Sequence, residues 1–191
     1  MSIEISEKLS PKHTKIIHYD IPDGLNYLFG KNGTGKTMLF DAISGMASHS
    51  NYTVLVDGTL VYLNQNNYFP SQLKVREYLT FIYLLDGMTD GLAYFKEFLS
   101  RYDLNLQMSF EEKIGLLSGG ERQFLYVLSI LSLERTWYLL DEPFNSLDYE
   151  SKEFIFYLLK EMKKQGKSVL LTSHESLEEF DKNYWNKIMI Q

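Results

Sequence analysis

The sequence predicts an α/β fold built on a mostly parallel β-sheet. Short apolar runs typical of strands buried on both faces, at residues 137–140 and 168–172, alternate along the chain with helical segments. A glycine-rich loop at residues 30–37 stands between a strand and a helix. Hydrophobic residues make up 45% of the 191 residues, enough for one continuous core. Strands that alternate with helices form parallel sheets with helices on their faces, so we expect this architecture.

The first elements surround the glycine-rich loop. Residues 16–19 and 26–29 predict short strands, separated by a Pro-Asp-Gly turn at residues 22–24. Residues 36–44 predict a helix that begins at the loop and is stopped by Gly45. Residues 53–56 and 60–63 predict a β-hairpin around the turn Asp57-Gly58.

The later elements begin with a helical segment. Residues 75–102 have a helical pattern that breaks at 86–87 and 90–91, and they are rich in large apolar side chains. Helices are also expected at residues 119–133 and at about 150–165, where Gly166 stops the second one. The runs 137–140 and 168–172 are the buried strands, and residues 187–190 predict a last strand.

Composition and charge exclude several classes of protein. The formal net charge of −6 argues against a general nucleic-acid-binding protein, because phosphate backbones attract basic surfaces, and we expect no nucleic-acid partner. The chain has no cysteine, which excludes disulfides and thiolate metal sites. Its start lacks the pattern of a signal peptide, and no run of about 18 apolar residues could span a membrane. We therefore expect any membrane role to come through a partner.

The glycine-rich loop predicts a nucleotide site, because it fits the pattern G-x-x-x-x-G-K-[S/T]. Glycines allow consecutive backbone N–H groups to curl around phosphate oxygens, and the following helix adds its positive end. Lys36 can reach the β- and γ-phosphates, and the Thr37 hydroxyl can ligate Mg²⁺. An ordinary glycine turn is the alternative, and the loop alone does not separate kinases, GTPases and transport ATPases. The predicted nucleotide-binding residues are Gly30, Lys31, Asn32, Gly33, Thr34, Gly35, Lys36 and Thr37.

A second phosphate-facing segment is predicted at the start of the helix at 119–133. Ser118 with Glu121 three residues later forms a capping box, which is a purely structural reading. However, Gly119 and Gly120 weaken the first turn of the helix, and a structural cap does not require them. Glycines at a helix N-terminus allow close approach of an anion, so a second phosphate-binding surface is the sharper interpretation.

Residues 117–123 (LSGGERQ) resemble the signature motif of ABC ATPases, and other segments follow in that family's order. Gln65 resembles the Q-loop glutamine, and residues 138–143 (YLLDEP) resemble the Walker B strand. Residues 145–148 (NSLD) resemble the D-loop, and residues 172–174 (TSH) resemble the H-switch. The resemblance covers nearly the whole chain, from about residue 21 to the final strand. It implies the ABC-type P-loop NTPase fold, in which antiparallel N-terminal strands and a small helical subdomain accompany the mostly parallel core.

The resemblance also implies a domain organisation and partners. A single ATPase domain would span 1–191, with a nucleotide-binding core at 1–68 and 116–191 and a helical subdomain at 69–115. The chain would form an ATP-dependent homodimer, or a heterodimer with a similar subunit, and would act with a transmembrane permease at the cytoplasmic face of the cell membrane. Residues 74–79 (KVREYL) resemble a segment frequent in exporters of drug or antimicrobial-peptide type, so export is expected.

Roles for the acidic and polar residues follow from their positions and from the resemblance. Asp141 ends an apolar strand, at the sheet edge where α/β proteins bind ligands, and would hold Mg²⁺ with Thr37 and Gln65. Glu142 follows and can act as the general base toward water. The remaining implied residues are His174, Lys36 and Gln65 at the γ-phosphate, and Ser118, Gly119, Gly120 and Asp148 toward the nucleotide of a second subunit.

Two alternative functions stay open, as does the recognition of adenine. A soluble ABC ATPase acting on ribosomes or DNA has the same motifs, although such relatives usually carry two ATPase domains or long insertions. A small-molecule kinase would share the phosphate loop but leave residues 117–123 unexplained. The aromatic residue that usually stacks on adenine in the family is missing between residues 8 and 14, where His13 has the only ring.

Overall fold

The chain folds into two compact units. The computed structural model describes residues 2–8, 16–31, 33–47, 52–65, 70–106, 108–174 and 184–190. The first unit comprises residues 1–65, 135–143 and 153–191, and the second comprises residues 66–134 and 144–152.

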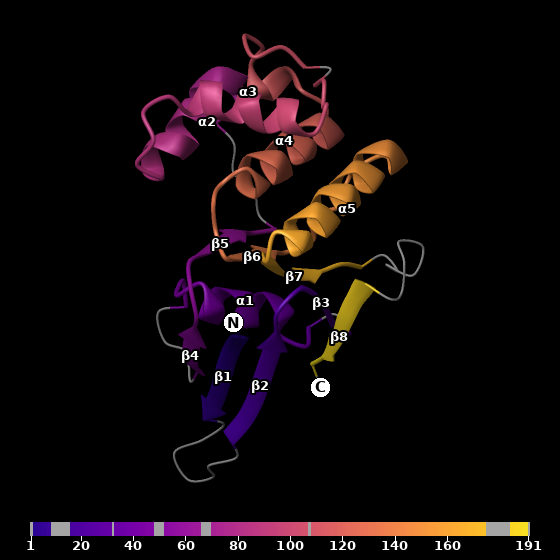
Figure 1. The fold of residues 1–191 in the computed structure, drawn as a ribbon. Helices are drawn as coiled ribbons and strands as arrows, with labels where there is room; N and C mark the ends of the chain where they lie inside the picture. The colour runs from indigo at the N-terminus through magenta and orange to yellow at the C-terminus, as the bar shows by residue number, and fades with distance from the viewer. Residues whose placement is uncertain are drawn as a thin grey trace. The chain divides into compact units, whose positions relative to one another are not determined.

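In the first unit, the described strands form two sheets (Figure 1). An antiparallel sheet has the order β2-β1-β4, and a parallel sheet has the order β5-β6-β7-β3-β8. The antiparallel strands are β1 (Ser2–Lys8), β2 (Ile16–Pro22) and β4 (Tyr52–Val56). The parallel strands are β3 (Leu25–Phe29), β5 (Leu60–Leu63), β6 (Trp137–Leu140), β7 (Ser168–Thr172) and β8 (Trp185–Met189).

One hydrophobic core joins the two sheets to α1 (Lys36–Ile43). Ile3 of β1, Leu28 of β3, Phe40 of α1 and Trp137 of β6 all belong to it and are fully buried. Every residue of β6 and β7 is buried, as their continuous apolar sequences predict. The core therefore fixes α1, and the loop before it, against the parallel sheet.

The second unit is helical and contains α2 (Val75–Leu85), α3 (Gly91–Arg101), the short 3-10 helix η1 (Ile114–Leu116) and α4 (Gly119–Leu131). The helices α2 and α3 pack so closely that a Cβ added to Gly91 would lie 2.3 Å from the Tyr83 Cβ. Tyr78 and Tyr83 of α2 hydrogen-bond the buried hydroxyls of Ser129 and Ser132, which ties α2 to α4 and the residue after it. The helix α5 (Tyr149–Lys164) begins in this unit and continues in the first.

The structure confirms the predicted fold class, with its mostly parallel sheet, antiparallel N-terminal strands and helical segments. The breaks predicted at residues 86–87 and 90–91 separate α2 from α3. Strand β1 was not predicted. Among the residues that the structure describes, no helix has the length and apolar character needed to cross a membrane.

The predicted hairpin at residues 53–63 is wrong, although both of its strands exist. Strand β4 pairs with β1 in the antiparallel sheet, whereas β5 pairs with β6 in the parallel one. A Cβ on Gly58 (φ +111°) would lie 2.5 Å from the Thr136 Oγ1, and the Thr59 N–H donates to that same hydroxyl (3.0 Å). The Asp57-Gly58 signal thus marks a close approach of two chain segments, where the chain passes from one sheet to the other.

Candidate functional site

The glycine-rich loop requires glycine at three of its described positions. Gly33 (φ +81°) and Gly35 (φ +91°) adopt left-handed backbone, and Gly35 is the N-cap of α1. A Cβ on Gly30 would lie 2.7 Å from the Thr34 Oγ1. The Lys36 Nζ donates to the carbonyl oxygens of Gly30 (2.8 Å) and Lys31 (3.3 Å), so the ammonium group lies across the loop. Asn32 falls outside the described residues.

Asp141, the first of the two acidic residues after β6, is hydrogen-bonded to Thr37 of the phosphate loop. Asp141 is buried, and its Oδ2 accepts a hydrogen bond from the Thr37 Oγ1 (2.9 Å). Its Oδ1 accepts from the Thr172 Oγ1 (2.6 Å) at the end of β7. A hydroxyl and a carboxylate side by side are hard oxygen donors that, together with substrate phosphates, suit Mg²⁺. The side chains of Thr37 and Asp141 therefore fit the metal role predicted for them.

The second acidic residue has an unusual backbone conformation. Glu142 is buried and left-handed (φ +53°), a region that non-glycine residues adopt uncommonly and that is enriched at functional sites. Its Oε2 accepts the backbone N–H of His174 (2.9 Å), and the His174 Nε2 lies 3.4 Å from its Oε1. Burial raises the pKa of the Glu142 carboxyl above its ordinary value, and the hydrogen bond from His174 opposes this shift. Two of the four predicted catalytic residues, Glu142 and His174, are thus in contact.

Gln65 belongs to the same edge of the parallel sheet by register. It follows β5 by two residues, and Leu63 at the end of β5 pairs with Leu140 at the end of β6. The Asp141 N–H continues this pairing by donating to the Leu63 carbonyl (2.9 Å). The side chain of Gln65 is exposed, and residues 66–69 lie outside the described part of the chain.

A pocket of about 930 Å³ lies where β3 and β7 end, next to the start of the glycine-rich loop. This is the edge of a parallel sheet where α/β proteins bind ligands. The Tyr27 hydroxyl donates to the Ser173 carbonyl (3.1 Å), and the rings of Tyr27 and Phe29 stack with centroids 6.1 Å apart. The pocket is lined by Tyr27, Phe29, Gly30, Lys31, Thr34, Ser173, His174, Met189 and Ile190.

The remaining predicted residues lie in the second unit. Ser118 is the N-cap of α4: its hydroxyl accepts the Glu121 N–H (3.2 Å), and its own N–H donates to the Glu121 Oε2 (2.7 Å). The capping box is therefore present, as predicted. Asp148 accepts the Ser151 N–H (2.8 Å) in the first turn of α5, and this hydrogen bond lowers the pKa of its carboxyl.

The two signature glycines differ in their surroundings. A Cβ on Gly120 would lie 2.8 Å from the backbone carbonyl oxygen of Ser146, whereas no described residue comes within 4 Å of a Cβ on Gly119. Gly120 thus lets the start of α4 approach the loop at residues 144–148, while the packing of the described residues does not require glycine at position 119.

This contrast predicts different effects of two alanine substitutions on stability. We expect Gly120→Ala to lower the free energy of unfolding by about 1–3 kcal/mol, because the backbone must move to relieve the overlap. Gly119→Ala should leave stability unchanged or raise it slightly, because alanine favours a helix. Urea unfolding followed by circular dichroism measures both. Equal midpoints for the two variants would contradict the prediction.

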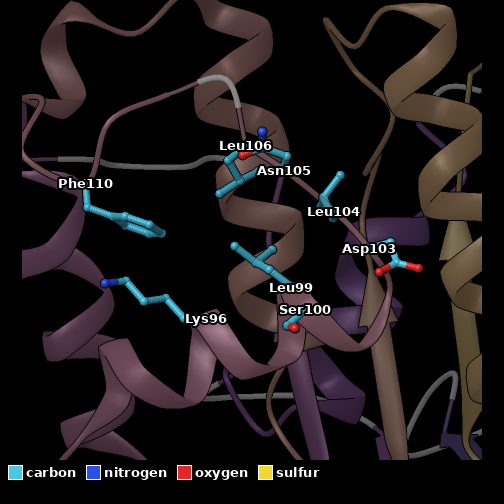
Figure 2. A pocket seen from close by; sticks show the side chains of 8 residues that line it. All are labelled: Lys96, Leu99, Ser100, Asp103, Leu104, Asn105, Leu106 and Phe110. Atoms are coloured by element: carbon cyan, nitrogen blue, oxygen red, sulfur yellow. The ribbon is translucent and has the colours of Figure 1, made fainter.

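A second pocket, of about 360 Å³, lies within the helical unit and is a different kind of site (Figure 2). It is formed by the C-terminal half of α3, the segment after it, and Phe110. The Lys96 Nζ lies 5.2 Å from the centre of the Phe110 ring, a cation–π contact. None of the predicted nucleotide-binding or catalytic residues lines this pocket.

A glycine loop precedes helix α1, and an acidic pair follows β6 at the same edge of the parallel sheet. This combination places the chain among the P-loop nucleotide-binding proteins. The sequence model of the family described as ABC transporter matches residues 15–145, more than half of the chain. The chain therefore belongs to the ABC transporter family, as its motifs predicted. It is an ATP-binding component of that family, whose members hydrolyse ATP to power transport.

Known proteins resemble the chain along most of its length. The energy-coupling factor transporter ATP-binding protein EcfA3 of Oenococcus oeni is 30% identical, over 91% of this chain and 67% of that protein. The cytochrome c biogenesis ATP-binding export protein CcmA of Reclinomonas americana is 27% identical, over 84% of this chain and 78% of that protein. A solved ABC transporter ATP-binding protein of Pyrococcus furiosus has the same fold, with a TM-score of 0.77, 22% identity and coverage of 100% of this chain and 98% of that one.

Sequence reasoning gave no separate role to one residue of this site, Thr172. It was recognised only as part of the motif at residues 172–174. Its contacts with Asp141 and Glu142 depend on the pairing of β6 with β7. In the sequence, 27 residues (141–167) separate the end of β6 from the start of β7. A hydroxyl residue at the end of a buried strand is the signal that could have drawn attention to it.

Proposed function

We propose that the chain is the ATP-hydrolysing subunit of an ABC transporter, and that it works as a dimer around two Mg-ATP molecules. One observation carries the proposal. At one edge of the parallel sheet, Asp141 bonds the Thr37 hydroxyl of the phosphate loop, and Glu142 beside it contacts His174. A metal ligand, a base and a phosphate partner therefore lie next to the loop that holds the nucleotide.

Each residue has a chemical role in this proposal. The loop amides and Lys36 bind the β- and γ-phosphates, and Thr37, Asp141 and Gln65 hold Mg²⁺. When bound, Mg²⁺ would supply positive charge to neutralise the charge that develops on the phosphate oxygens. Glu142 accepts a proton from the attacking water, and the hydrogen bond from the His174 backbone keeps its carboxylate in place. His174 donates to the γ-phosphate from an exposed position beside the pocket at β3 and β7.

The proposed dimer would meet a need of phosphoryl transfer. Catalysis is mostly positioning and charge stabilisation, so the γ-phosphate needs donors on every side. The phosphate loop covers one side. We propose that Ser118, Gly119 and Gly120 of a second subunit cover the other, and that Asp148 contacts the partner. The space beside Gly119 supports this, because none of the residues that the structure describes lies within 4 Å of a Cβ added to this glycine.

We propose the remaining organisation on the same basis. The whole of 1–191 forms one ATPase domain, with its nucleotide-binding core at 1–68 and 116–191 and a helical subdomain at 69–115. ATP-binding subunits of ABC transporters act with membrane-spanning partners, and we place this one at the cytoplasmic face of the membrane with such a permease. The dimer is a homodimer or pairs two similar subunits.

The prediction that the transporter is an exporter rests on residues 74–79 alone. The charged residues of this segment have structural partners: the Lys74 N–H donates to the Glu77 Oε2 (2.9 Å), and Lys74 and Arg76 both pair with Glu111. The names of the relatives include an export protein and an energy-coupling factor transporter, so they do not favour export.

A tagged pull-down from detergent-solubilised membranes of the native host tests the proposed partner. We expect a stoichiometric polytopic membrane protein, identified by mass spectrometry, and its binding should persist after nuclease treatment. Recovery of ribosomal proteins or DNA-repair factors without a membrane protein would instead favour the soluble ATPase alternative, and would leave the ATPase site itself unaffected.

A further inference from the structure

The hydroxyl of Thr172 lies between the two acidic residues of the proposed site. Thr172 is the last residue of β7 and is fully buried. Its Oγ1 donates to the Asp141 Oδ1 (2.6 Å) and accepts the backbone N–H of Glu142 (3.0 Å). One buried side chain therefore contacts both members of the acidic pair.

The first contact fixes the orientation of the Asp141 carboxylate. Each of its oxygens accepts from a different threonine hydroxyl, the Oδ1 from Thr172 and the Oδ2 from Thr37. The carboxylate cannot rotate without losing one of these bonds, since both partners come from packed elements, β7 and α1. The Oδ2 therefore stays directed at the Thr37 hydroxyl, where the proposed metal ion binds.

The second contact anchors the backbone N–H of Glu142, a residue with left-handed backbone (φ +53°). The Thr172 hydroxyl, at the end of β7, accepts this N–H in a buried environment (3.0 Å). The Glu142 carboxylate then reaches the His174 N–H on the same connection after β7. Removal of the hydroxyl would leave the buried N–H without this acceptor, which disfavours the conformation.

We propose that Thr172 is a positioning residue of the ATPase site, whose single hydroxyl sets both the orientation of Asp141 and the backbone of Glu142. This inference rests on the proposed function of these two residues. Thr172 touches neither nucleotide nor water in this proposal, and it acts only through the acidic pair. Networks of this kind contribute more than their separate hydrogen bonds, because each bond holds the next in place.

The test compares Thr172→Val, which keeps the shape but removes the hydroxyl, with Thr172→Ser, which keeps the hydroxyl. Loss of a hydrogen-bond partner of a metal-ligating carboxylate typically lowers activity or metal affinity by about 10–100-fold. We expect Thr172→Val to lower kcat for ATP hydrolysis by this amount in the purified full chain. Thr172→Ser should restore most of the rate, and a serine variant as slow as the valine variant would overturn the proposal.

Ser168, at the opposite end of β7, provides a matched control. It is also buried, and its hydroxyl accepts the Gly24 N–H (3.0 Å) and lies 3.4 Å from the Asp23 carboxylate. Ser168→Ala thus removes a comparable pair of contacts away from the acidic pair. We expect it to lower the thermal midpoint as Thr172→Val does, but to leave kcat unchanged. Equal losses of kcat in the two variants would assign Thr172 a structural role only.

A binding measurement separates this inference from the proposed function. Mn²⁺, detected by electron paramagnetic resonance, is titrated into the chain loaded with a non-hydrolysable ATP analogue. Thr172→Val should bind Mn²⁺ about 10–100-fold more weakly than wild type and bind the analogue equally well in EDTA. Unchanged Mn²⁺ affinity and unchanged kcat would overturn the positioning role alone. A wild-type chain that neither hydrolyses ATP nor binds Mn²⁺ with the analogue would overturn the proposed function. If Thr172→Val does not fold, Thr172→Ala serves the same comparison.

Discussion

Replacing Glu142 with glutamine is expected to lower the steady-state rate of ATP hydrolysis by about 10²–10⁴-fold, the usual contribution of a general base. The amide keeps the size of the side chain and its carbonyl can still accept the His174 N–H, but it cannot take a proton from water. Because hydrolysis would release the dimer, the variant should accumulate as an ATP-bound dimer. Light scattering with saturating Mg-ATP measures this state, and rapid phosphate assays measure the rate.

Glu4→Gln is the matched control for this experiment. Glu4 has an exposed side chain on β1 of the antiparallel sheet, so its amide variant loses the same charge elsewhere in the molecule. It should hydrolyse ATP at the wild-type rate and show no trapped dimer. If the Glu142 variant remains a monomer in saturating Mg-ATP, the isolated chain does not use the proposed dimer mechanism.

Lys36→Ala is expected to weaken ATP binding by at least about 30-fold, since loss of one partner of a close charge pair typically costs 2–5 kcal/mol. The Lys36 ammonium lies across the phosphate loop, bonded to two of its carbonyl groups, and is therefore held where phosphates bind. The substitution removes both the charge toward the nucleotide and these bonds within the loop. Equilibrium titration with a fluorescent ATP analogue in EDTA measures the affinity without metal.

Lys31→Ala distinguishes a specific role of Lys36 from a general effect of positive charge. Lys31 belongs to the same loop, but its side chain is exposed, and the loop uses its backbone carbonyl as an acceptor. We expect its alanine variant to bind the analogue within a few-fold of wild type. Similar losses in both variants would show that net charge, and not the placement of Lys36, determines affinity.

The parts of the fold that the sequence predicted well are those with one dominant signal. Strands β6 and β7 are continuous apolar runs, and their observed bounds match the prediction, because burial on both faces leaves little ambiguity. The phosphate loop had an equally clear signal in its glycines, because Gly33 and Gly35 occupy positions whose left-handed backbone other residues rarely adopt. The Asp57-Gly58 turn misled because the same two residues suit a hairpin and a crossing between sheets.

The candidate site was predictable as a set of residues but not as an arrangement. The sequence places Asp141 and Glu142 after one strand and His174 after another, and sheet edges bring such residues together. The left-handed backbone of Glu142 and its bond to Thr172 could not be predicted, because they depend on which strands are neighbours. His13, the only ring near the expected adenine site, lies outside the described residues, so its role stays a prediction.

The strand order sets the distance between the strand that leads into the phosphate loop and the strand that leads into the acidic pair. Strand β7 lies between β3, which leads into the phosphate loop, and β6, which leads into the acidic pair. Two spacings of about 4.8 Å therefore separate β3 from β6, roughly 10 Å in all, and the side chains of Thr37 and Asp141 meet across this distance at 2.9 Å. This separation of the two strands is set by the sheet and does not depend on loop conformation. Insertion or loss of a strand between β3 and β6 would therefore change the distance between the phosphate loop and the acidic pair, whereas changes in helices and loops elsewhere around the sheet would leave it the same.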